Sequence, residues 1–156
     1  MGTLFPEPAG GFANRSEEER GAEVAGLADT MVCGVVRADS YARAKKYYTD
    51  VLGLKQGQEF PGPGPGGMFE AAGGTMLMVY ERPGLKAPEN TVLGFGVSAD
   101  GFDAVMAGLR SKGVVFEDYD IPEMGLKTTN GVADMGGMRS AWFKDSEGNI
   151  LNLASM

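Results

Sequence analysis

The chain has 156 residues, a length that suits one domain with a single hydrophobic core. Its 14 basic and 21 acidic residues give a net charge of −7. A field of that sign repels a phosphate backbone, so we expect no nucleic-acid partner. The chain contains no histidine, which excludes Ser/His/Asp and Cys/His catalytic arrangements and every metal site that needs imidazole.

Nothing in the sequence predicts export or insertion into a membrane. No run approaches the roughly 18 consecutive apolar residues that span a bilayer, and residues 1–11 lack a basic segment leading into an apolar stretch. Cys33 is the single cysteine, so an internal disulfide cannot form. We therefore expect a cytoplasmic protein with no membrane partner.

Residues 1–29 predict a flexible N-terminal arm. This segment is rich in Gly, Pro, Ala and Glu and has too little apolar periodicity to specify a packed element. The spacing of Ser16 and Glu19 fits a capping box, which allows a short helix through Leu27. The folded domain is expected to begin at residue 30 and to run to residue 156.

The first half of this domain predicts one strand, one helix and three further strands. Apolar and β-branched residues over 30–37 favour a strand. After Asp39 or Ser40 as a cap, apolar residues at three- and four-residue spacing predict a helix through Leu52, which Gly53 ends. The Pro/Gly run at 61–67 predicts a surface loop. The remaining strand segments are 54–60, 68–72 and 75–81.

The second half repeats this order after about 60 residues. A strand over 91–98 precedes a helix over 101–112. The later strand patterns lie at 114–119, 126–134, 139–144 and 150–154, with a turn at 145–149. The sequence thus predicts an α+β fold of two βαβββ modules, at about 30–82 and 91–155, that bury their apolar faces in one core.

Three segments resemble the vicinal oxygen chelate superfamily of glyoxalases, bleomycin-resistance proteins and extradiol dioxygenases. They are RAKKYYTDVLGL at 43–54, the helical stretch at 101–113 and FKDSEGNILNL at 143–153. The resemblance covers about residues 30–155. It implies that the two modules form a glyoxalase-like curved sheet around a cleft, and that the protein is a homodimer.

The resemblance also implies where the metal ligands of metal-dependent relatives would lie. Those ligands, typically His, Gln and Glu, come from the first and last strands of each module. In this sequence the corresponding positions are Cys33, Leu77 or Met78, Gly94 and Asn152. One thiol and one neutral amide cannot chelate a divalent cation. We therefore predict no metal site and no cofactor.

The closing hairpin determines which side chains we expect in the cleft. If it pairs symmetrically about Glu147, Trp142 lies opposite Asn152 on one face of the sheet. Trp142 then forms either a wall for a flat ligand or ordinary core packing, and Arg37 either holds an anionic group or ends a strand in solvent. The acidic cluster around Pro122 is expected to be a solvated loop. The candidate ligand-binding residues are Cys33, Arg37, Met78, Tyr80, Gly94, Trp142 and Asn152.

We predict a metal-free protein, similar to glyoxalases and bleomycin-resistance proteins, that binds a small hydrophobic or aromatic molecule. The alternative is a lyase or isomerase of the same superfamily that acts without the usual metal, with Glu70, Tyr80 and Cys33 near the cleft. A third hypothesis is an interaction module whose arm docks on a partner subunit. The sequence assigns no catalytic residue and does not identify the ligand.

Overall fold

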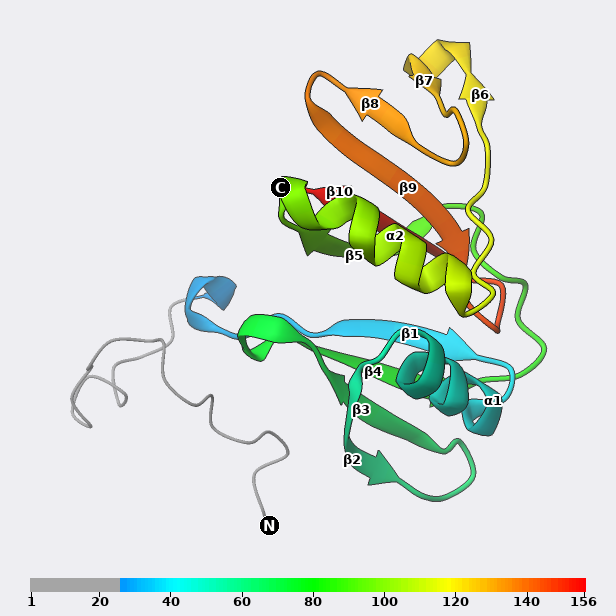
Figure 1. Cartoon of the computed structure of the whole chain (residues 1–156). Coiled ribbons are helices and arrows are strands. Elements are labelled where there is room, and N and C mark those ends of the chain that lie inside the picture. The colour runs from blue at the N-terminus through cyan, green and yellow to red at the C-terminus, as the bar shows by residue number, and fades with distance from the viewer. Residues whose placement is uncertain (1–25) are drawn as a thin grey trace.

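The computed structural model describes residues 26–156, and two similar modules lie one above the other in it (Figure 1). The first sheet has the strand order β1-β4-β3-β2, with β1 parallel to β4 and the other pairs antiparallel. Helix α1 continues into a π-helical turn at Tyr47–Val51. The elements are β1 (Gly34–Ala38), α1 (Tyr41–Lys46), β2 (Lys55–Phe60), β3 (Gly66–Glu70) and β4 (Met76–Glu81).

The second module repeats this topology, because its sheet has the order β5-β10-β9-β8 with β5 parallel to β10. The predicted α+β fold of two βαβββ modules is therefore confirmed. Within the described part of the chain, no helix is both long and apolar enough to cross a membrane. The elements are β5 (Thr91–Val97), α2 (Phe102–Ser111), β8 (Ala133–Met135), β9 (Met138–Lys144) and β10 (Ile150–Ser155).

The strand predicted over 114–119 is wrong. Phe116 makes one isolated bridge to Phe143, after which Asp118 turns away to accept hydrogen bonds from Gly131 N–H and Thr128 Oγ1. A small hairpin of β6 (Asp120–Ile121) and β7 (Leu126–Lys127), joined by a 3₁₀ turn at Pro122–Met124, therefore projects from the module (Figure 1). The predicted strand over 126–134 is divided between β7 and β8 by a left-handed turn at Asn130 and Gly131.

Two strand boundaries also differ from the sequence prediction. A 3₁₀ turn at Leu27–Asp29 precedes β1, so β1 begins at Gly34 instead of residue 30. Strand β3 begins at Gly66, within the segment predicted to be a loop. Gly67 is required there because a Cβ atom would overlap the Tyr41 hydroxyl. Of the predicted arm, residues 1–25, with the proposed Ser16 cap, lie outside the described residues.

Both modules contribute to one core. Tyr48 packs against Phe69 in the first module, with ring centroids 5.6 Å apart, and Phe116 packs against Phe143 in the second at 5.5 Å. Buried side chains from the helices and from one face of each sheet form a single apolar cluster. The other face of each sheet carries the alternate residues, and these positions contain the candidate site.

Side chains of the turn between β9 and β10 bind the second module to the first. The fully buried Glu147 side chain accepts hydrogen bonds from the N–H groups of Asp39 and Ser40, at 2.9 and 3.0 Å. It also pairs with Nε and Nη2 of Arg43, at 2.8 and 2.9 Å. A carboxylate is favourable at this point because Asp39 and Ser40 directly precede α1, at the helix end where N–H groups have no partner within the helix.

Candidate functional site

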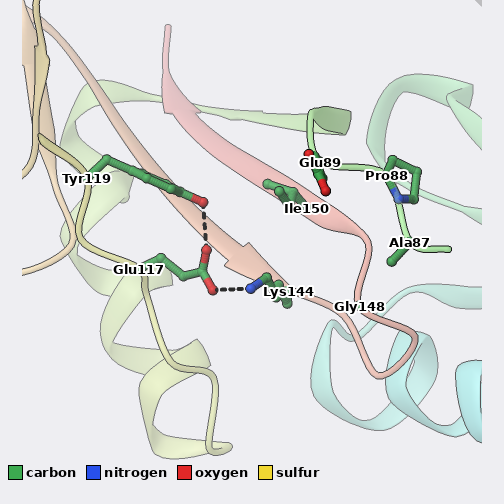
Figure 2. Close-up of a pocket in the computed structure, with 8 residues that line it drawn as sticks. All are labelled: Ala87, Pro88, Glu89, Glu117, Tyr119, Lys144, Gly148 and Ile150. Atoms are coloured by element: carbon green, nitrogen blue, oxygen red, sulfur yellow. Dashed lines mark hydrogen bonds and ion pairs between the residues drawn. The ribbon is translucent and has the colours of Figure 1, made fainter. Parts of the chain in front are cut away.

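A pocket of ≈ 450 Å³ lies beside the face of the second sheet that points away from the core (Figure 2). Lys144 and Ile150 are register partners at the ends of β9 and β10, and both extend from this face. Figure 2 shows the chain segment before β5 passing beside Gly148 and Ile150. The lining residues are Ala87, Pro88, Glu89, Glu117, Tyr119, Lys144, Gly148 and Ile150.

Gly148 allows the connecting segment to approach the hairpin closely. Its φ of 80° lies in the left-handed region, and a Cβ atom there would be 3.3 Å from Cβ of Ala87. The turn from Asp145 to Asn149 therefore has two roles. Its buried side chains contact the first module, and its backbone forms part of the pocket wall.

Three polar side chains, Lys144, Glu117 and Tyr119, are linked by hydrogen bonds along one side of the pocket. Lys144 Nζ lies 2.8 Å from Glu117 Oε1, and the Tyr119 hydroxyl donates to Glu117 Oε2 at 2.6 Å (Figure 2). Burial raises the pKa of Glu117, but the hydrogen bonds from Lys144 and Tyr119 outweigh it and hold the pKa below its ordinary value. Burial and the adjacent carboxylate raise the pKa of Tyr119 to about 12. At neutral pH the carboxylate is thus ionised and the phenol is protonated.

Trp142 lies next to Tyr119, just outside the pocket lining. Its half-buried indole donates a hydrogen bond from Nε1 to Thr91 Oγ1 at 3.2 Å. Its ring meets that of Tyr119 nearly at right angles, with centroids 5.9 Å apart. This edge-to-face contact and the hydrogen bond to Thr91 hold the indole in one orientation.

The predicted pairing of the closing hairpin is confirmed. Asn152 is the register partner of Trp142 on one side and of Gly94 on the other, so these three share one face. The Asn152 side chain donates to the carbonyl of Ala141 at 3.2 Å. Gly94 is exposed, and a Cβ atom there would meet only the Asn152 side chain, at 3.8 Å.

The other four candidate residues belong to the first module. Met78 of β4 is the register partner of Val35, and Tyr80 of β4 is the partner of Arg37. Cys33 immediately precedes β1 and donates a weak hydrogen bond to its neighbour's carbonyl, at 3.3 Å. None of the seven candidate residues lines the pocket. Their assignment as ligand contacts stays a prediction.

Arg37 is not the solvated strand end that the sequence left open. Only 9% of its side chain is exposed, and Nη1 pairs with Oδ1 of Asp39 at 2.7 Å. Its Nε is buried and finds no hydrogen-bond partner among the residues that the structure describes.

The sequence prediction missed the residues that line the pocket. Glu117 belongs to the acidic cluster predicted to be a solvated loop, yet two partners hold it. The alternation of Glu117 and Tyr119 in an extended segment was a usable signal, since residues two apart share a face. The segment from Ala87 to Glu89 has no periodicity, so nothing in the sequence places it against Gly148.

The residues at the implied metal positions match a divalent cation poorly. Across 26–156, no group of three His, Cys, Asp or Glu side chains lies close enough to hold one. At the positions implied by the family resemblance, Met78, Gly94 and Asn152 supply no carboxylate and no imidazole. Hard and borderline divalent cations need several such ligands.

Solved structures support the fold assignment. The glyoxalase family protein from Enterococcus faecalis is 20% identical with a TM-score of 0.62, over 83% of this chain and 99% of that one. A glyoxylase/bleomycin resistance protein/dioxygenase domain from Frankia sp. EAN1pec is 14% identical with a TM-score of 0.61, over 80% and 95%. The fosfomycin resistance protein FosX from Listeria monocytogenes, in complex with Mn(II) and sulfate, is 11% identical with a TM-score of 0.58, over 81% and 93%.

The family model agrees with these structural similarities. No curated protein matches the chain. The model described as "Glyoxalase/Bleomycin resistance protein/Dioxygenase superfamily" matches residues 28–153, which include both modules and the closing hairpin. This chain therefore belongs to the glyoxalase/bleomycin resistance protein/dioxygenase superfamily.

Proposed function

We propose that the protein binds a small aromatic or apolar molecule against Trp142, without a metal. The observation that carries this proposal is the indole itself, which is half-buried on the sheet face directed away from the core and fixed by Thr91 and Tyr119. A tryptophan needed only for packing would be expected on the core face, where Phe143 and Leu151 lie. Trp142 is instead next to the pocket residues Tyr119 and Lys144.

The composition of the pocket supports a small organic ligand. Its volume of ≈ 450 Å³ falls in the range of about 300–1,000 Å³ that is typical of small-molecule sites. Ile150, Ala87 and Pro88 give it an apolar wall, and the Glu117–Lys144 pair gives it a polar rim. A mainly apolar site with a few placed polar groups selects ligands by shape and orientation.

Trp142 also provides the measurement, because it is the only tryptophan in the chain. Nile red, a neutral flat dye, is expected to bind the full chain, with a rise in its own emission and a matching loss of tryptophan emission. Trp142→Ala should weaken dye binding about tenfold, since truncating a stacked aromatic side chain costs roughly 1–3 kcal/mol. Titration followed by dye fluorescence measures both proteins.

The control is Val105→Ala, which shortens a side chain on α2, the helix that packs on the core face. This variant should bind the dye as the parent protein does. Equal affinity of the parent protein and Trp142→Ala would show that the dye does not use the indole, and the proposed function would then be wrong.

The lyase or isomerase alternative receives less support from the geometry. Glu70 of β3 is paired at 2.9 Å with Lys55 of the neighbouring outer strand β2. Near the pocket, the raised pKa of Tyr119 makes its phenol a weak proton donor at neutral pH. Glu117 and Tyr119 are therefore better suited to form a fixed polar rim of the pocket than to transfer protons.

We also propose that the protein is a cytoplasmic homodimer. The outer strands β2 and β8 each have one edge without a strand partner in the described sheets, and such edges favour association. Met135 and Met138, at the tip of β8 and β9, add exposed apolar surface. Sedimentation equilibrium should give twice the chain mass of 16.4 kDa. A single species at the chain mass would contradict the dimer.

A further inference from the structure

The face of the first sheet that points away from the core carries three methionine side chains. Met68 of β3 and Met78 of β4 are register partners, so their side chains lie on the same face. Met76 lies two residues before Met78 along β4 and shares that face. Leu77 and Val79, which alternate with them, are buried in the core. The three thioethers therefore lie together on the opposite face.

The single thiol of the chain belongs to the same face. Strand β1 is parallel to β4, and their register pairs Gly34 with Leu77. Continued by one residue, this register places Cys33 opposite Met76. The Cys33 thiol is half-buried and takes part in no disulfide. Its one hydrogen bond among the described residues is the weak contact with the Gly34 carbonyl, so the sulfur is available to a stronger partner.

The spacing of these side chains allows their sulfur atoms to meet. Cβ atoms of opposed residues such as Met68 and Met78 are about 4.5–5.5 Å apart, and the flexible methionine side chain can direct its sulfur toward a shared point. Met68 is 2% exposed, so its neighbours cover it, whereas Met76 and Met78 are half-buried. An ion can therefore reach the group from the solvent side and find one ligand below it.

The chemistry of this group selects a soft, monovalent cation. Thiolate and thioether sulfur are soft ligands, and among the metals that proteins use they favour Cu(I). Thioethers carry no charge, so one thiolate together with them balances a single positive charge. The nearest carboxylate in the register is Glu70, the partner of Met76, and it is already paired with Lys55 at 2.9 Å. A harder divalent ion would find too few charged ligands here.

We propose that this face binds one Cu(I) ion through four sulfur atoms, those of Cys33, Met68, Met76 and Met78. On binding, the thiol proton is released to solvent and the thiolate donates an electron pair to the ion, whose oxidation state does not change. Met68 and Met76 are outside the ligand positions that the family resemblance implies. The site is on the first module, so it does not depend on ligand binding at Trp142.

The test transfers Cu(I) to the full chain, without oxygen, from its coloured complex with bicinchoninate, and the loss of colour measures uptake. The parent protein should take up one ion per chain. Cys33→Ser should bind Cu(I) about a hundredfold more weakly, because it removes the charged ligand, and Met78→Leu about tenfold. Leucine keeps the size and apolar character of methionine, so this loss reports the sulfur. Met124→Leu, on a 74% exposed methionine beside β7, is the control and should bind as the parent does.

A second measurement follows the thioethers in the parent protein. In a spectrum of the protein labelled with ¹³C at the methionine methyl groups, the signals of Met68, Met76 and Met78, assigned from their leucine variants, should shift when Cu(I) is added. The Met124 signal should stay in place. If Met78→Leu binds as the parent does and these signals do not shift, the thiol alone holds the ion and the proposed site is overturned. A chain that takes no Cu(I) from bicinchoninate overturns it as well, and the dye titration tests Trp142 separately.

Discussion

Replacing Asp145 with alanine is expected to lower the free energy of unfolding by about 4 kcal/mol. The Asp145 carboxylate is buried at the start of the β9–β10 turn. Oδ1 accepts from the N–H groups of Glu147 and Asn149, at 2.8 and 2.9 Å. Oδ2 accepts from the Tyr48 hydroxyl and from Asn149 Nδ2, both at 2.8 Å. Alanine would leave the Tyr48 hydroxyl and the N–H groups of Glu147 and Asn149 without these acceptors, whereas Asn149 Nδ2 would keep its bond to the Arg37 carbonyl.

Urea denaturation followed by far-ultraviolet circular dichroism measures this loss. Asp145→Asn keeps the shape and one acceptor oxygen, so it should be intermediate between alanine and the parent protein. The matched control is Asp120→Ala, which removes an exposed carboxylate lying 3.4 Å from Lys127. Its urea midpoint should stay at the parental value. If Asp145→Ala unfolds at the same urea concentration as this control, the buried network does not stabilise the fold.

Glu147→Gln is expected to cost about 2 kcal/mol at pH 7 and to change the response of the protein to acid. Burial raises the pKa of Glu147, but the hydrogen bonds from Arg43 and the Ser40 N–H outweigh it and hold the pKa below its ordinary value. A carboxyl whose pKa is lower in the folded state stabilises the fold above its unfolded-state pKa of about 4.3. That contribution disappears as the pH falls through the lower, folded-state pKa.

The measurement is the urea midpoint between pH 7 and pH 3 for the parent protein and for Glu147→Gln. The difference in urea midpoint between the two proteins should be largest near pH 7 and should become smaller below about pH 4.3. Glu89→Gln, on an exposed side chain, serves as the control and should follow the parent curve. If the difference in urea midpoint stays constant down to pH 3, the charge of Glu147 does not stabilise the contact between the two modules.

The parts of the fold that local chemistry determines were predictable from the sequence. A turn centred on Glu147 and the two-residue period of a strand fix Trp142 opposite Asn152, and the structure has that register. Ser40 caps α1 by accepting from the N–H of Arg43, and Gly53, with a φ of 72°, follows the end of the helical segment. Each of these features depends on residues close together in the chain.

The parts that were not predictable depend on contacts between distant segments. Apolar and aromatic residues favour a strand over 114–119, but Asp118 is bound by Gly131, so the chain leaves the sheet. From the sequence alone, Arg37 could end a strand in solvent. Only the structure shows that its side chain is buried. The pocket likewise depends on a connecting segment whose own sequence carries no periodic signal.

If the pocket binds a ligand as we propose, the turn from Asp145 to Asn149 makes ligand affinity and assembly of the two modules thermodynamically linked. The same five residues hold α1 through Glu147, contact β1 through Asn149 and contribute Gly148 to the pocket wall. A ligand that prefers this turn in its docked conformation also stabilises the docked pair of modules, by the same coupling free energy. Substitutions at the start of α1, remote from the pocket lining, are therefore expected to alter ligand affinity through this turn.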